Sequence, residues 1–444
     1  MKKRFFGTDG IRGEANKHPM TSETALYLGM AAGTYFKKAN SQNMVIIGKD
    51  TRRSGYMLEF ALVSGFAAVG MDVKILGPIP TPAIGILTRS LRAELGVMIS
   101  ASHNGYADNG IKLFGSDGFK LSDKEELEIE ALLAEPEKIK RAGPKDIGLV
   151  KSFEDSRGRY VEVVKACLPR GLRLDGLRIV IDCANGAAYK TAPWALWELG
   201  AEVVEIGVNP NGMNINDGCG STNLTQLREK VIERRADLGI ALDGDADRIA
   251  IIDEKGNEID GDQIIASIAS NMLASGNLRG PVVTTVMSNL GLENFIKSRG
   301  AEFIRTDVGD RNVVMAMREH GSNLGGEQSG HVVALDYATT GDGLISALLV
   351  LGAMVEQEKK ASEVLNCFTP MPQILKNIRY TGKSPLLVDK NAKLVEQVKQ
   401  DMAAKGARLV VRTSGTEPLV RLMAEGEDED MIRKTIDELA AAIA

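Results

Sequence analysis

The chain has 444 residues, of which 44% are hydrophobic and 25% are charged, and its formal net charge is −5. This length is more than one hydrophobic core usually serves and predicts several domains, while the composition excludes a disordered chain. The acidic balance argues against nucleic acid as a partner, and without an apolar stretch of about 18 residues we expect no membrane span.

The first part of the chain alternates short β-branched runs with amphipathic helical runs. Strands are expected at 44–47, 73–76 and 96–99, and a helix at 56–69, with Ser54 placed to cap its first amides. Because strands and helices alternate, the pattern predicts an α/β unit with mainly parallel strands.

The same order recurs twice along the chain. We expect a strand, helix and strand at 177–181, 189–199 and 202–206, and again at 282–286, 289–299 and 302–305. The recurrence predicts three related α/β units, although no sequence repeat is strong enough to prove duplication.

The last stretch has a different pattern. Helices are expected at 388–404 and 428–443, and strands at 407–411 and 419–424, which predicts a small α+β domain of two strands covered by two helices. Prolines between 370 and 385 indicate a linker before it. The predicted domains are 1–153, 154–254, 255–368 and 369–444.

The cysteines and the first residues of the sequence indicate the cellular compartment of the protein. Cys167, Cys183, Cys219 and Cys367 form no CxxC pair, which is typical of single reduced thiols. The basic start of the chain leads into a Gly/Asp turn without an apolar signal core. We therefore expect a cytoplasmic protein.

The first chemical motif is a run of aspartates. Asp243, Asp245 and Asp247 alternate directly after the apolar run 238–242. On an extended loop they would point the same way, and three carboxylates so close repel one another unless a cation lies among them. Oxygen ligands suit Mg²⁺, with a solvated acidic turn as the alternative. A Ca²⁺-binding EF-hand is excluded because Arg248 stands where that loop needs Gly.

The second motif is Ser-Ala-Ser-His-Asn at 100–104, directly after the strand expected at 96–99. A serine at the end of a parallel strand lies where α/β proteins bind ligands. A hydroxyl needs a base or a metal to become a nucleophile, and His103 would point away from Ser102 on an extended segment. The glycines of a hydrolase elbow are missing, so the alternative is an ordinary Ser/Asn turn.

The third motif is the glycine-rich segment 325–331, which contains Glu327, Ser329 and His331. Glycine lets the backbone approach a ligand closely, while Glu accepts hydrogen bonds from sugar hydroxyls and Ser donates them. A flexible polar surface loop is the alternative.

The fourth motif joins the two strands of the C-terminal domain and contains Arg412, Ser414, Gly415, Thr416 and, further on, Arg421. Hydroxyls, a glycine amide and two guanidinium groups can form a phosphate cradle, because the forked guanidinium matches phosphate oxygens. An ordinary strand-joining turn is the alternative.

Two further basic residues follow glycine-rich turns. Arg12 lies in the turn 7–13, and Lys112 follows Asn109-Gly110 and could carry a proton or pair with a phosphate. Each alone is more typical of a surface residue. Taken together, the four motifs fall in four successive domains, which predicts a central cleft between them.

In this order and spacing, the four motifs resemble those of the α-D-phosphohexomutase superfamily, from Gly7 to Arg421. The resemblance implies three related α/β domains and a smaller C-terminal α+β domain around a deep cleft. The segments 6–13, 327–331 and 339–343 are most similar to the bacterial branch that acts on glucosamine phosphate, which implies a role in amino-sugar synthesis for the cell wall.

The resemblance also implies roles for individual residues. Ser102 would be the phosphoserine, and one Mg²⁺ would be held with a phosphoserine oxygen by Asp243, Asp245 and Asp247. Sugar hydroxyls would contact Glu327 and Ser329. The non-reacting phosphate would be held by Arg412, Ser414, Gly415, Thr416 and Arg421. The residues implied to line the reacting centre are Arg12, His103, Lys112 and His331.

The implied reaction interconverts glucosamine 6-phosphate and glucosamine 1-phosphate through a hexosamine 1,6-bisphosphate. The same chemistry on mannose or glucose phosphates is an alternative, because Gln328 alone does not settle specificity. A haloacid-dehalogenase-type phosphatase would have Thr or Val where Asp247 stands, and a non-catalytic phosphosugar-binding protein would need no phosphoserine. The expected partner is a small sugar phosphate; the oligomeric state stays open, with a homodimer as one possibility.

One position departs from the superfamily pattern. Gly105 stands where Pro usually follows Ser-His-Asn. Glycine leaves a turn freer than proline would, so we expect an effect on the rate rather than on the function.

Overall fold

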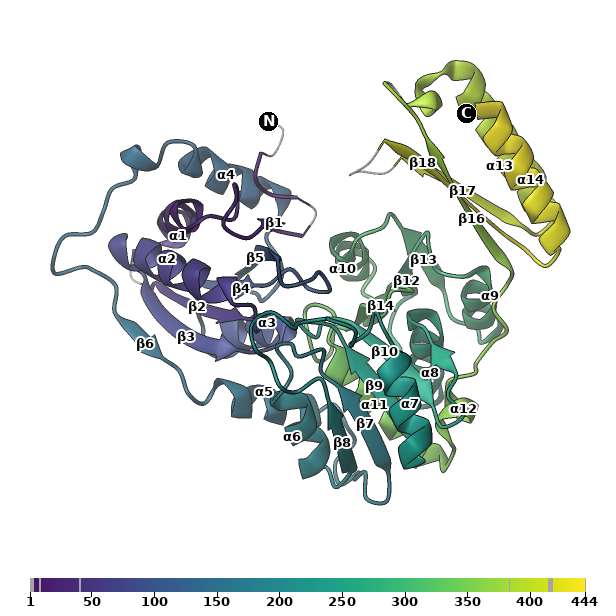
Figure 1. The fold of residues 1–444 in the computed structure, drawn as a ribbon, viewed down its shortest axis with the longest axis horizontal. Helices are drawn as coiled ribbons and strands as arrows, with labels where there is room; N and C mark the ends of the chain where they lie inside the picture. The colour runs from purple at the N-terminus through teal and green to yellow at the C-terminus, as the bar shows by residue number, and fades with distance from the viewer. Residues whose placement is uncertain (1–3, 8, 40, 383, 414–417, 444) are drawn as a thin grey trace.

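The computed structural model describes residues 4–7, 9–39, 41–382, 384–413 and 418–443. Four β-sheets follow one another along the chain, and helices cover them (Figure 1). The sheets contain six, five, four and three strands in the described residues. Among these residues, no helix is long and apolar enough to cross a membrane.

The first sheet has two purely antiparallel strands beside four parallel ones. Its order across the sheet is β1 (Ile11–Glu14), β5 (Asp108–Gly115), β4 (Leu95–Ile99), β2 (Met44–Lys49), β3 (Asp72–Pro78) and β6 (Val150–Ser152). The strands β4, β2, β3 and β6 run parallel, while β5 pairs antiparallel with both β4 and β1.

The second and third sheets repeat the central part of this order. The second is β11 (Glu258–Ile259), β10 (Ile249–Asp253), β9 (Leu238–Leu242), β7 (Arg178–Asp182) and β8 (Glu202–Ile206). The third is β13 (Phe303–Thr306), β12 (Val282–Thr285), β14 (Leu324–Gly326) and β15 (Val332–Ala334). The strands β10 and β15 are antiparallel to their neighbours, as β5 is in the first sheet.

The three sheets therefore contain the same four-strand unit. In each unit the first strand is central, the second pairs on one side and the third on the other, and an antiparallel fourth strand follows the third. The four strands are β2, β3, β4 and β5, then β7, β8, β9 and β10, then β12, β13, β14 and β15. The prediction of three related α/β units is confirmed.

Helices cover both faces of these sheets, because their parallel strands bury side chains on both faces. The helices are α1 (Ser22–Phe36), α2 (Ser54–Ala68), α3 (Thr81–Ser90), α4 (Asp123–Leu133), α5 (Ser156–Lys165), α6 (Thr191–Glu198), α7 (Thr225–Arg234), α8 (Gly261–Ala274), α9 (Leu290–Ser298), α10 (Asp310–Glu319), α11 (Gly343–Gln357) and α12 (Ala361–Val364). In β2, Val45 and Ile47 pack toward α1 and α2, whereas Met44 and Ile46 pack toward α3, as strand alternation requires.

The predicted cap of α2 is wrong. The residue that precedes this helix is Arg53, which makes no side-chain capping bond. Ser54 is the first helical residue, and its hydroxyl instead accepts a hydrogen bond from Asn109 Nδ2 at 2.8 Å. This contact ties the start of α2 to β5.

The C-terminal unit has one strand more than predicted. Its antiparallel sheet has the order β16 (Gln373–Arg379), β18 (Leu419–Glu425), β17 (Arg408–Thr413), and the helices α13 (Asp389–Ala403) and α14 (Glu429–Ile443) pack against it. The unpredicted strand is β16, a mixed run of polar, charged and apolar residues that lies inside the predicted linker, between Pro372 and Pro385. Figure 1 shows this unit standing apart from the first two sheets, beside the third.

Candidate active site

Three of the four sequence motifs occupy the same place in their units. The serine segment lies between β4 and β5, the aspartates between β9 and β10, and Glu327 between β14 and β15. In each four-strand unit the motif follows the third strand. The second and third strands lie on opposite sides of the first strand, so the motif lies beside the point where the strand order reverses. Parallel sheets bind ligands at this point, at the carboxyl ends of the strands.

These hairpins meet at a cavity of about 400 Å³. Its walls come from the N-terminal turn and from all three α/β units. The lining residues include Asp9, Arg12, Ser102, Asp247, Arg248, Asp310, Glu327 and His331. The predicted central cleft is therefore present, and it brings together carboxylates, guanidinium groups, a serine and a histidine.

Ser102 has an unusual backbone conformation. Its φ is +54°, in the left-handed region that favours glycine. The buried hydroxyl donates to Asp243 Oδ2 at 2.6 Å and lies 3.4 Å from His103 Nδ1. The expectation that His103 points away from Ser102 is wrong, because a left-handed residue turns the chain instead of extending it.

The three aspartates converge as predicted, but for a different reason. They lie in a turn, where Ala246 has a φ of +59°, and not on an extended loop. Ligand oxygens of Asp243, Asp245 and Asp247 all lie within 4.8 Å of one another, and all three residues are buried. Close packing in the turn gathers the carboxylates.

This cluster fits a magnesium ion. Oδ1 of Asp245 and Oδ1 of Asp247 are buried oxygens with no hydrogen-bond partner. Burial, reinforced by Asp247 and Asp245, raises the pKa of Asp243 well above its usual value. An all-oxygen donor set with crowded, unsatisfied carboxylates is the arrangement that a hard divalent cation stabilises.

Lys112 pairs directly with the aspartates. Its buried Nζ is 2.8 Å from Asp245 Oδ2 and 3.4 Å from Asp247 Oδ2. Burial opposes the charge, but Asp245, Asp9 and Asp247 raise the pKa of Lys112 well above its usual value. Lys112 therefore carries its proton at neutral pH and stabilises the cluster.

A chain of ion pairs borders the cavity and joins the first and third units. Lys120 contacts Asp9 on one side and Asp310, at the start of α10, on the other. His331 Nε2 accepts from the Gly341 N–H at 3.1 Å, and its Nδ1 lies 3.8 Å from Asp247 Oδ2. The neighbouring carboxylates Asp247 and Asp310 raise the pKa of His331 in spite of its burial.

His103 has the opposite electrostatic setting. Burial, followed by the nearby guanidinium groups of Arg248 and Arg12, lowers the pKa of His103 to about 4. The imidazole beside Ser102 is therefore neutral at pH 7, and with so low a pKa it is a weak proton acceptor at that pH. Arg12 itself pairs with Asp9 and lines the cavity that contains Ser102.

Three charged residues that line the cavity, and Lys120 next to it, were not given roles by the sequence. Arg248 directly follows the third aspartate, and its partly buried side chain lies 4.0 Å from Asp247. Asp9, Lys120 and Asp310 form the ion-pair chain. For Arg248 and Asp9, adjacency to a motif is a usable signal. Lys120 and Asp310 are 190 residues apart, and no local pattern indicates their contact.

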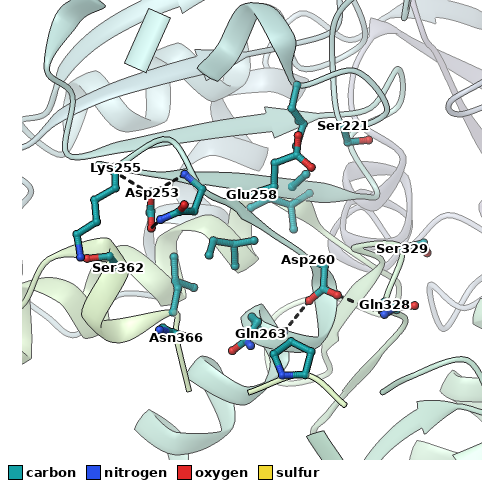
Figure 2. Close-up of a pocket in the computed structure, with 18 residues that line it drawn as sticks. Ser221, Asp253, Lys255, Glu258, Asp260, Gln263, Gln328, Ser329, Ser362 and Asn366 are labelled. Carbon is teal, nitrogen blue, oxygen red and sulfur yellow. Dashed lines mark hydrogen bonds between the residues drawn. The ribbon is translucent and has the colours of Figure 1, made fainter. Parts of the chain in front are cut away.

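The glycine-rich segment faces two cavities. Glu327 lines the cavity with Ser102 and accepts from the Gly309 N–H at 3.1 Å. Ser329 and Gln328 instead line a separate cavity of about 590 Å³. Figure 2 shows that cavity, with Gln328 donating to Asp260 and Ser329 at its edge. The structure does not bring Ser329 into the cavity that contains Ser102.

The fourth motif lies on the C-terminal unit. Arg412 and Arg421 are directly opposite each other on β17 and β18. Burial and the neighbouring Arg421 charge lower the pKa of Arg412, so an anion between the two would be stabilised. Arg412 lines a third cavity, of about 500 Å³, whose wall includes Val308, which also lines the Ser102 cavity. Ser414, Gly415 and Thr416 lie outside the described residues.

Four family models match successive parts of the chain. They describe phosphoglucomutase/phosphomannomutase alpha/beta/alpha domain I at residues 3–140, domain II at 158–256, domain III at 260–371 and the C-terminal domain at 375–442. Together they span nearly the whole sequence.

Curated relatives match over full length. A phosphoglucosamine mutase of Novosphingobium aromaticivorans is 56% identical over 444 residues, which is 100% of this chain and 99% of the relative. One of Zymomonas mobilis is 54% identical over 444 residues, with the same coverage of both chains.

Solved structures share the fold. A phosphoglucomutase/phosphomannomutase family protein of Burkholderia thailandensis has a TM-score of 0.83 at 24% identity and covers 99% of this chain and 97% of its own. The N-acetylphosphoglucosamine mutase of Aspergillus fumigatus, solved with GlcNAc-6P and magnesium, has a TM-score of 0.66 at 18% identity and covers 100% and 96%.

Proposed function

The chain belongs to the phosphoglucomutase/phosphomannomutase family of the α-D-phosphohexomutase superfamily, and we propose that it interconverts glucosamine 6-phosphate and glucosamine 1-phosphate. In this proposal a phosphoryl group moves between two oxygens of a sugar by way of a phosphorylated Ser102. The relatives named phosphoglucosamine mutase support the choice of sugar. Glucose or mannose phosphates remain the alternative substrates.

The observation that carries the proposal is the position of Ser102. Its hydroxyl donates to Asp243 at 2.6 Å, in a cavity that Arg12, Arg248 and Glu327 also line. A serine that faces three buried carboxylates is a poor acceptor of an anionic phosphoryl group unless a cation offsets their charge. This arrangement supports phosphoryl transfer with a divalent cation at the aspartates.

The first transfer starts from phospho-Ser102. O1 of glucosamine 6-phosphate attacks the phosphorus, the bond from phosphorus to Ser102 Oγ breaks, and the O1 proton passes to a base. Of the residues implied to line the reacting centre, His103 lies 3.4 Å from Ser102 Oγ and is neutral, but its pKa of about 4 makes it a weak base. The product of this step is glucosamine 1,6-bisphosphate.

The second transfer follows after the bisphosphate turns over in the cleft. Ser102 Oγ attacks the phosphorus on O6, the bond from phosphorus to O6 breaks, and O6 takes up the proton. Glucosamine 1-phosphate leaves, and phospho-Ser102 is restored. The phosphorylated protein is therefore the form that begins and ends each cycle.

Charge stabilisation divides among several side chains. Mg²⁺, held by Asp243, Asp245 and Asp247, would supply positive charge to the phosphoryl oxygens. The protonated Lys112 and the guanidinium groups of Arg12 and Arg248 add positive charge from the protein. Positioning and electrostatics provide most of the rate in phosphoryl transfer, and this site has the groups for both.

The remaining predicted residues receive binding roles in the proposal. Glu327 accepts hydrogen bonds from sugar hydroxyls, since it faces the cavity. The non-reacting phosphate is bound by the C-terminal unit, through Arg412, Ser414, Gly415, Thr416 and Arg421. Ser329 can contact sugar only if the segment around it moves. The proposal includes a cytoplasmic location, where the four free cysteines would stay reduced.

The test is a mutase assay of the phosphorylated protein with Mg²⁺ that offers glucosamine, mannose and glucose 6-phosphates side by side. We expect kcat/KM for glucosamine 6-phosphate to exceed the other two by at least about 10-fold, the discrimination that a few polar contacts provide. A preference for mannose or glucose phosphate would change the assigned substrate and leave the proposed phosphoryl-transfer chemistry unchanged. Release of inorganic phosphate in place of isomerisation would contradict the proposal.

A further inference from the structure

A buried arginine outside the motifs holds the serine segment. Arg52 is fully buried, and its guanidinium donates to the carbonyl oxygens of Ser102 at 2.9 Å, Asn104 at 2.8 Å and Asp108 at 3.0 Å. It also donates to the carbonyl of Gly105. Four backbone carbonyls between residues 102 and 108 therefore accept hydrogen bonds from one side chain.

Asp50 extends this contact to the amide of Ser102. Arg52 Nε donates to Asp50 Oδ2 at 2.7 Å, and the Ser100 hydroxyl donates to the same oxygen at 2.6 Å. The N–H of Ser102 then donates to Ser100 Oγ at 2.9 Å. Both the N–H and the carbonyl of Ser102 are thus fixed from the end of β2.

The second unit holds the same carbonyls. Asn216 Nδ2 donates to the carbonyl oxygens of Ser102 at 2.9 Å and Asn104 at 3.0 Å. The aspartate turn also packs closely here, since a Cβ on Gly244 would lie 2.6 Å from the Ser102 carbonyl oxygen. These contacts therefore fix the position of the serine segment relative to the aspartate turn.

We propose that Arg52 and Asn216 are positioning residues, which hold Ser102 in its left-handed conformation so that its hydroxyl faces the aspartates. This inference rests on the proposed function. Neither residue lines the Ser102 cavity, and both act through the backbone of the serine segment. They also turn the carbonyl dipoles away from the cavity, where negative ends would repel an incoming phosphate.

The chain has a particular need for this support. A φ of +54° is unfavourable for a serine, and Gly105 leaves the following turn without the restriction that a proline would give. Phosphoryl transfer is sensitive to such freedom, because a misplacement of about 1 Å can cost about 100-fold in rate. The side-chain contacts supply the order that the local sequence lacks.

The test is Arg52→Lys, which keeps the charge but loses the forked donors. We expect kcat with glucosamine 6-phosphate to fall about 100-fold, with KM changed by less than about 3-fold, because the substrate contacts remain. Asn216→Ala is expected to lower kcat about 10-fold with the same unchanged KM. Arg53→Lys, at the neighbouring exposed arginine, is the matched control and should keep wild-type values.

A second readout separates positioning from general destabilisation. Amide hydrogen exchange measured by mass spectrometry should rise in residues 100–108 of Arg52→Lys and stay unchanged in the C-terminal unit. Retention of kcat within about 3-fold in both variants would overturn the proposal, as would a uniform rise in exchange across the chain. If Arg52→Lys fails to fold, the kcat and the hydrogen exchange of Asn216→Ala test the proposal instead. If the wild type has no mutase activity, the proposed function fails, and the exchange in residues 100–108 still tests the support by Arg52.

Discussion

Ser102→Ala is expected to lower kcat of the mutase reaction by at least about 1,000-fold, because the variant has no oxygen to carry the phosphoryl group between transfers. The change removes one buried hydroxyl and its bond to Asp243, so the fold should persist. The measurement is a steady-state mutase assay with Mg²⁺ and glucosamine 1,6-bisphosphate, together with intact-protein mass spectrometry for phosphate on the chain.

The matched control is Ser116→Ala, at an exposed serine directly after β5. It should retain wild-type activity and phosphate content. If Ser102→Ala kept more than about a tenth of the wild-type kcat, the reaction would not pass through this serine, and the proposed mechanism would be wrong.

The second large effect is expected from Asp243→Asn. Loss of one of three carboxylate ligands should weaken Mg²⁺ binding and lower kcat/KM by at least about 100-fold at a fixed Mg²⁺ concentration. Magnesium titrations of activity and calorimetry of Mg²⁺ binding measure both quantities. Asp217→Asn, at an exposed aspartate of the same unit, is the control.

Although Asp243→Asn should lower activity, it should not lower the thermal stability of the metal-free protein in EDTA. Burial, and then Asp247 and Asp245, raise the pKa of Asp243 on folding. The protonated carboxyl therefore stabilises the fold at low pH, and this contribution is lost as the pH rises through the folded pKa. Asparagine removes that loss. At pH 8 in EDTA we expect Asp243→Asn to unfold at a temperature no lower than wild type, while Mg²⁺ raises the unfolding temperature only of wild type. Equal Mg²⁺ stabilisation of both proteins would argue against a metal at the aspartates.

Much of the fold could be predicted because parallel strands are short, apolar and separated by helical patterns. The strand expected at 202–206 matches β8 in both bounds, and most other predicted elements differ by one or two residues. The antiparallel fourth strands were missed. Segments such as β5 (Asp108–Gly115) mix glycine, lysine and apolar residues, because Ile111 and Leu113 pack in the core while Lys112 reaches the aspartates.

The site could be predicted where its chemistry is contiguous in sequence. Ser102 and the aspartates follow buried strands, and the family resemblance gave them their roles. What holds Ser102 could not be predicted, because Arg52 reaches it across 50 residues of sequence and Asn216 across 114. The left-handed φ of Ser102 depends on these distant bonds and has no signal in the pentapeptide itself.

The domain boundaries near 153, 254 and 368 stay predictions. A single hydrophobic cluster includes residues of all three α/β units, from Met44 through Ile181 to Leu365. With the cores merged in this way, side-chain packing does not mark where one unit ends and the next begins. The boundary before the C-terminal unit is the best defined, because that unit has its own cluster around Val420 and Ile436.

The most direct test of the account is a single turnover with labelled phosphate on Ser102. Protein that carries ³²P at this serine would be mixed with Mg²⁺ and an excess of unlabelled glucosamine 6-phosphate. We predict that the label leaves the protein and appears first in glucosamine 1,6-bisphosphate and then on O1 of glucosamine 1-phosphate. Label that stays on the protein while product forms, or that leaves as inorganic phosphate, would contradict the account.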